Sequence, residues 1–135
     1  MILLLAFFLA FDLSAVKTVP NPERRSDLAL ENANHAINEA RTAYQAGDVK
    51  KADVELIEVR ESVDVSLDAL ESSGKQPRRS KYYKQAEIKL RHMLRRLSGF
   101  RDEMSVEDRK PLDDAATRMQ EVHDRLLSEI MSKKR

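Results

Sequence analysis

Four stretches of the chain place apolar residues alternately three and four positions apart, and this spacing constrains the fold more than any other feature. In an α-helix such residues lie on one stripe, which must be covered by another apolar surface. The links between the stretches are short, so successive helices are expected to be antiparallel. The stripes are Leu30, Ala33, Ile37, Ala40 and Tyr44; Val49, Ala52, Leu56, Val59, Val63, Ser66 and Leu70; Tyr83, Ala86, Leu90, Met93, Leu97, Phe100 and Met104; and Leu112, Ala115, Met119, Val122, Leu126 and Ile130.

This pattern predicts an all-α protein in which residues 26–135 form an antiparallel, up-down-up-down four-helix bundle. Gly47 and Gly74 end the first two helices, and Asp48 is placed to cap the second. The fourth helix can begin after Ser105 or, behind a single turn, at Pro111. The same stripes suit a helical hairpin that dimerises, so a monomer and a homodimer both stay open. We expect the helices to span about 26–46, 48–73, 78–104 and 106–133.

The first stripe is rich in alanine, whereas the third carries leucine, methionine and phenylalanine. Small side chains let helix axes approach, and large side chains hold them apart. The first helix is therefore expected to lie closer to its neighbours than the third helix does.

The chain begins with an apolar run over residues 2–11, followed by Asp12 and the small pair Ser14 and Ala15. This order resembles a secretory signal peptide, so we expect residues 1–15 to direct export to the periplasm or outside the cell. An uncleaved anchor is the alternative, although the run is shorter than the roughly 20 residues that span a bilayer. Residues 16–25 are expected to form an extended linker because of two prolines, with Ser26 capping the first helix.

The turn between the first two helices contains Tyr44, Gly47, Asp48 and Ala52. In this arrangement it resembles the turn of a tetratricopeptide repeat, where a small residue lets two helices pack closely. No second copy of the pattern follows in the chain, and stacked repeats need such copies to bury their faces. We therefore interpret the run as a turn of an ordinary helical hairpin.

Charge is strongly segregated between the second and third helices. Residues 48–71 hold eight acidic and three basic residues, whereas residues 75–101 hold ten basic residues and one acid, Glu87. If the two helices are antiparallel neighbours, some of these charges pair and fix the register. Several positive charges remain unmatched even then. The residues that could bind an anion or a partner are Arg78, Arg79, Lys81, Lys84, Arg91, Arg95 and Arg96.

These features lead to two hypotheses for function. The first is an exported interaction or structural module of the cell envelope with a protein partner. The second is an anion-binding protein whose basic face contacts an acidic polymer, an anionic lipid surface or an acidic partner. Nucleic acid is not expected, because an exported protein rarely meets it and few aromatic residues are present for base stacking.

Enzymatic, metal and cofactor sites are not expected. The chain has no cysteine, no glycine-rich phosphate loop and no Gly-x-Ser-x-Gly motif. A di-metal bundle needs Glu-x-x-His on two helices, and Gln120 replaces the glutamate before His123. The histidines His35, His92 and His123 flank the stripes, so we interpret them as surface or boundary residues.

Overall fold

The computed structural model describes residues 12–132, and the part of the chain that it describes is helical without any strand. The all-α class is therefore confirmed. Most of the predicted signal segment, residues 1–11, lies outside the described residues. The elements are α2 (Leu13–Lys17), α3 (Pro22–Gln45), α4 (Val49–Ser72), α5 (Lys81–Glu103), the single 3-10 turn η1 (Val106–Asp108) and α6 (Lys110–Met131).

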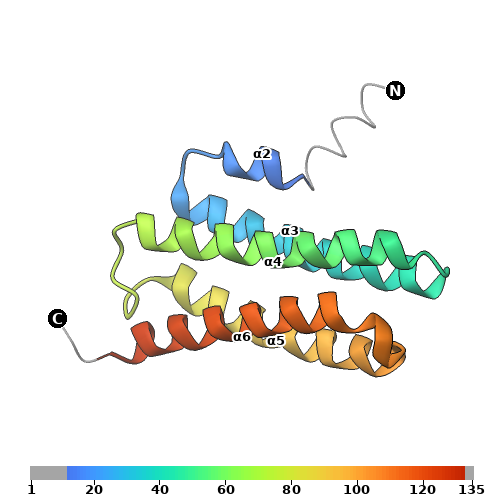
Figure 1. Cartoon of the computed structure of the whole chain (residues 1–135). Coiled ribbons are helices and arrows are strands. Elements are labelled where there is room, and N and C mark those ends of the chain that lie inside the picture. Colours follow the sequence, from blue (N-terminus) through green and yellow to red (C-terminus); the bar gives the residue numbers. More distant parts are fainter. Residues whose placement is uncertain (1–11, 133–135) are drawn as a thin grey trace.

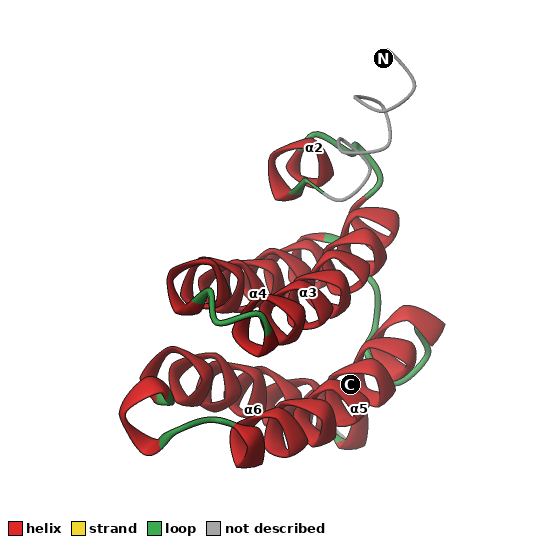
Figure 2. Ribbon diagram, turned by 90° about the vertical axis from the view of Figure 1, so that its right-hand side faces the viewer, coloured by secondary structure: helices red, strands yellow, loops and turns green. Residues whose placement is uncertain are grey.

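The four long helices form two antiparallel hairpins that stack as layers (Figure 1). Helices α3 and α4 make the first layer, and α5 and α6 make the second. Seen end-on, α3 lies over α5 and α4 lies over α6, while α2 covers the opposite face of the first layer (Figure 2). Helices α4 and α5 follow one another in the chain but occupy diagonal corners.

Polar contacts show how the two hairpins are aligned. Contacts from α3 to α5 follow the same order along both helices, so these two neighbours run parallel. The same holds for α4 and α6. The pairs are Asp27 with Lys89, Asn34 with Arg96 and Arg41 with Glu103, and then Asp64 with Arg118 and Glu71 with Arg125.

The apolar stripes form one core between the layers. Leu56 and Val63 from α4 are completely buried, as are Leu90 and Leu97 from α5. Phe100 closes one end of this core and meets the ring of Tyr44 edge-on, with 6.0 Å between the ring centroids. The periodicity of the sequence thus locates the buried face of every long helix.

Helices α3 and α4 pack more closely than α5 and α6 do, as the alanine-rich first stripe predicts. Their interface also buries polar groups in pairs. The hydroxyls of Ser26 and Ser66 are 2.7 Å apart, and the Asn32 amide donates to Ser62 at 2.9 Å and to Glu58 at 3.0 Å. Each short polar side chain finds a partner because the two backbones lie close together.

The N-terminal boundary differs from the prediction. Instead of an extended linker over 16–25, residues 13–17 form α2, and α3 begins four residues before Ser26, at Pro22. Proline is accepted at the first helical position because its missing amide has no intrahelical acceptor there. Asn21 caps the helix by accepting from the amide of Arg24 at 3.0 Å. Ser26 is consequently buried inside α3 and does not cap it.

The other helix ends follow local chemistry. Gly47 and Gly74 have φ of 83° and 71°, a region where a side chain is strained, so both glycines suit the turns that they make. Asp48 accepts from the amide of Lys51 at 3.1 Å and caps α4 as predicted. Of the two starts for the last helix, the structure shows a single turn, η1, followed by α6 with Pro111 in its first turn.

Candidate functional site

The outer face of α5 contains most of the predicted binding residues. Ser80 starts the helix by accepting from the amides of Tyr82 and Tyr83 at 3.2 and 3.4 Å. With this start, the stripe that includes Tyr83 and Leu90 turns inward, and the cations between the stripe residues point to solvent. The helix therefore presents a basic surface along its length.

Two of the seven predicted cations are used inside the fold. Arg91 donates two hydrogen bonds of 2.9 Å to the carboxylate of Glu87, one turn earlier in α5. Arg96 reaches across to α3, where it donates to the side-chain oxygens of Asn34 and Asn38. Arg91 therefore acts within α5, whereas Arg96 joins α5 to α3, and both arginines already have partners.

The other five predicted cations are exposed and form no ion pair within residues 12–132. One of them, Lys81, lies 5.3 Å from the centroid of the Tyr82 ring. Their charges are compensated by solvent and not by the fold. We call these five residues the basic face: Arg78, Arg79, Lys81, Lys84 and Arg95.

The partial charge pairing that would hold if acidic α4 and basic α5 were neighbours is absent from residues 12–132. Across the described residues, no ion pair joins these helices, because they lie at diagonal corners (Figure 2). Carboxylates of α4 instead bind α6, where Arg118 lies 2.5 Å from Asp64 and Arg125 lies 2.6 Å from Glu71. The basic face is thus left without the partner that the sequence had suggested.

An apolar side chain interrupts the basic face. Ile88 lies between Lys84 and Arg95 on the outer side of α5 and is 44% exposed. The surface therefore combines positive charge with a contact that a hydrophobic group could cover. Such a combination suits a macromolecular partner better than a free ion.

The structure also shows a buried polar cluster that the sequence analysis missed. Nε2 of His123 in α6 lies 2.8 Å from Oε2 of Glu87 in α5, and each residue is only 9% exposed. His123 is therefore a buried residue at the edge of the core, which fits the boundary position among the two predicted for it and not the surface position. The hydrogen bonds from Arg91 and His123 lower the pKa of the Glu87 carboxyl, against the raising effect of burial.

A sequence signal for this cluster existed. Glu87 is the single acid in a strongly basic stretch, and it follows the stripe residue Ala86. His123 follows the stripe residue Val122 in the same way. Residues at such flanking positions on adjacent helices can meet at the edge of the core. The cluster contains an acid and an imidazole but no nucleophile, so we interpret it as a link between α5 and α6.

Tyr83 makes a second polar link, at the end of the core where α4 ends and α5 begins. Its hydroxyl donates to the carbonyl of Leu70 at 3.2 Å and so joins the start of α5 to the end of α4. Burial, followed by the nearby charges of Glu129 and Glu71, raises the pKa of Tyr83 to about 12. The phenol therefore stays protonated and remains a donor at ordinary pH.

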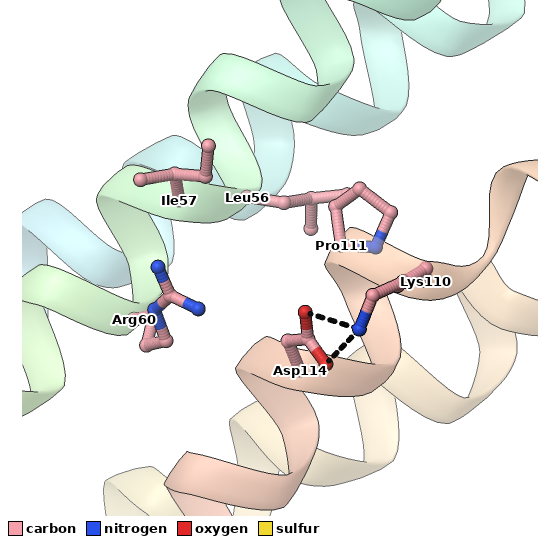
Figure 3. Close-up of a pocket in the computed structure, with 6 residues that line it drawn as sticks. All are labelled: Leu56, Ile57, Arg60, Lys110, Pro111 and Asp114. Atoms are coloured by element: carbon pink, nitrogen blue, oxygen red, sulfur yellow. Dashed lines mark hydrogen bonds and ion pairs between the residues drawn. The ribbon is translucent and has the colours of Figure 1, made fainter.

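A shallow groove of about 260 Å³ lies between α4 and α6. Figure 3 shows that Leu56, Ile57 and Arg60 face Lys110 and Asp114 across it, with Lys110 donating to both oxygens of Asp114 at 3.3 and 3.2 Å. The lining offers no nucleophile, and one of its two cations is already paired. This groove does not form a reactive site.

The described residues contain no group of three histidine, cysteine, aspartate or glutamate side chains that could hold a metal ion. No helix among them is both long and apolar enough to cross a bilayer. Comparison of the chain with protein-family models, curated proteins and solved structures found no match. The surface chemistry of the fold is therefore the basis for a functional proposal.

Proposed function

We propose that this protein is an exported, non-catalytic interaction module of the cell envelope that binds an acidic partner through the basic face. The observation that supports it is the position of these five cations. Lys81, Lys84 and Arg95 lie on one side of α5, Arg78 and Arg79 lie in the link before it, and acidic α4 occupies the diagonal corner. Positive charge that the fold does not neutralise is available to an acidic protein or polymer.

The proposed binding mode has two components. Long-range attraction to the basic face speeds association and weakens with salt, because exposed charges are screened over about 8 Å at physiological ionic strength. Exposed Ile88 adds a short-range apolar contact that salt does not screen. The two-layer hairpin arrangement holds both components on a rigid helix, which limits the entropy lost on binding.

Export is part of this proposal and follows from the apolar run at residues 2–11. In the envelope, the basic face would meet acidic proteins and anionic polymers rather than nucleic acid. No catalytic role is assigned, because the buried acid of the described core, Glu87, is already bound by Arg91 and His123.

Binding to poly-L-glutamate tests the proposal. We expect retention in low salt that disappears near about 0.5 M salt, where screening is nearly complete. Lys84→Glu combined with Arg95→Glu should weaken binding about tenfold or more, because both cations lie on the basic face. Fluorescence anisotropy with a labelled polymer measures the change.

A matched control reverses the charge at two positions outside the basic face. Lys50→Glu combined with Arg24→Glu alters the net charge equally, at exposed positions on α4 and α3. This variant should bind nearly as well as the unmodified protein. An equal loss of affinity in both variants would show that net charge alone drives the interaction. It would refute the proposal that the basic face is the binding surface.

A further inference from the structure

An open hollow of about 410 Å³ lies beside the link between α4 and α5, at the end of the basic face. Lys75, Arg79 and Lys81 all line it. We infer that this hollow binds a phosphate monoester group, an inference that rests on the proposed function and makes its ligand more specific. Two of the three cations belong to the basic face, and Lys75 is an addition that the sequence analysis did not single out.

The local backbone explains why three cations meet here. Gly74 turns the chain with φ of 71°, and the carbonyl of Gln76 then accepts from the amides of both Arg79 and Ser80 at 3.0 Å. These bonds fold the link into a tight turn. Side chains that are separated along the chain are thereby directed to one concave surface, which the start of α3 borders through Glu23.

The charge of the lining fits a dianion. Three cations face one carboxylate, Glu23, and none of these four side chains forms an ion pair within residues 12–132. A phosphate monoester carries about 1.5 to 2 negative charges at pH 7, which matches the excess of two positive charges. A single carboxylate would neutralise only half of that excess.

The donors also suit phosphate. The Arg79 guanidinium can donate two parallel hydrogen bonds to phosphate oxygens, and the lysines supply mobile point charges. Gln76 and Tyr82 add neutral donors to the lining. The amides of Tyr82 and Tyr83 at the α5 start are already bound by the Ser80 hydroxyl. Side chains must therefore provide the binding energy.

Titration with inorganic phosphate, followed through amide chemical shifts in NMR spectra, tests the inference. We expect saturable shifts concentrated in residues 74–82. Arg79→Gln and Lys75→Gln should each weaken the affinity about tenfold, since each removes a charge-assisted hydrogen bond. Lys50→Gln removes one exposed charge from α4, outside the hollow, and should leave the affinity within about twofold.

Two further arms distinguish the source of the phosphate group. Vesicles of phosphatidylcholine with phosphatidic acid, compared with phosphatidylcholine alone, present it on a lipid, and glycerol phosphate presents it in solution. Sedimentation with the acidic vesicles, reversed by glycerol phosphate, indicates a lipid headgroup. Glycerol phosphate binding without sedimentation indicates a soluble ligand. Both results support the site.

The inference is overturned if no phosphate compound shifts residues 74–82, or if Lys50→Gln weakens binding as much as Arg79→Gln. Circular dichroism spectra of each variant show whether the exposed substitutions leave the helices intact. The proposed function fails separately, because its test uses poly-L-glutamate and reverses Lys84 and Arg95, which do not line the hollow.

Discussion

The two hairpins solve the same packing problem in different ways. Helices α3 and α4 come close together over alanines and bury short polar side chains in pairs, such as Ser26 with Ser66. Helices α5 and α6 stand further apart over large apolar side chains and are linked by the Glu87–His123 contact. The close hairpin pairs short polar side chains within its interface, whereas the wider hairpin leaves Lys81, Lys84 and Arg95 without an ion-pair partner among the described residues. The surface that we propose for binding therefore lies on the second hairpin and the link that precedes it.

The largest expected effect comes from removing a large side chain from the second hairpin. Phe100→Ala should lower the free energy of unfolding by about 3–5 kcal/mol, because a fully buried ring leaves a cavity at the end of the core. Urea unfolding measures this loss. Val106→Ala, at a position that is 74% exposed, is the control and should change stability by less than about 0.5 kcal/mol.

The close packing of the first hairpin can be tested by adding side-chain volume to it. Ala36→Leu should cost about 1–3 kcal/mol, because the larger side chain has no space in the α3 core face. The same change at half-buried Ala116 in α6 should cost clearly less. Thermal unfolding measures both losses. If both substitutions lower the free energy of unfolding by the same amount, the two hairpins tolerate a larger side chain equally well.

The contribution of the Glu87–His123 contact to the free energy of unfolding should depend on pH. Glu87→Gln should reduce stability by about 1–2 kcal/mol at pH 7, because the charged partner of Arg91 and His123 is lost. The pKa of Glu87 is lowered in the fold, so its contribution is present above the ordinary value of 4.5 and disappears as pH falls through the lowered value. Unfolding curves of both proteins should therefore converge in acid.

Exposed Glu121 provides the control for that experiment. Glu121→Gln removes a carboxylate from the surface of α6, where Arg118 has a second partner in Asp64. The free energy of unfolding of this variant should differ little from that of the unmodified protein at every pH measured. A Glu87→Gln difference that stays constant down to pH 3 would contradict a role for the charged carboxylate.

The smallest expected loss concerns the polar pairs of the first hairpin. Ser66→Ala should cost about 1 kcal/mol, because it leaves the buried Ser26 hydroxyl without its partner. Combining it with Ser26→Ala should add little or even recover stability, since no buried hydroxyl is then unpaired. A double-mutant cycle in urea gives this coupling energy directly.

Local features of the fold could be predicted from the sequence. The four stripes locate the buried faces, Asp48 caps α4, and Gly47 and Gly74 turn the chain where expected. These predictions succeed because helix periodicity and turn chemistry act over only a few residues. Pro22 misled the prediction of the first helix, since proline favours both a linker and a first helical turn.

The arrangement of the helices in space could not be predicted in the same way. A stripe shows that a face is buried but does not identify the helix that covers it. Opposite charges suggested that α4 and α5 are neighbours, whereas Asp64 and Glu71 bind α6. The basic residues could be named from the sequence, but their lack of ion-pair partners depends on this arrangement.

If residues 1–15 are a signal peptide that is removed after Ala15, as the export proposal implies, helix α2 has a consequence for that cleavage. Leu13 and Val16 are 5% and 4% exposed and pack on Ala29, with Leu28 and Val65 beside them. Cleavage after Ala15, between Leu13 and Val16, would divide this contact and discard half of it. A peptidase acting there would find its cleavage site docked on the folded domain, so removal of the leader would have to precede folding. The fraction of chains that are cleaved would then depend on the rate of cleavage relative to the rate of folding.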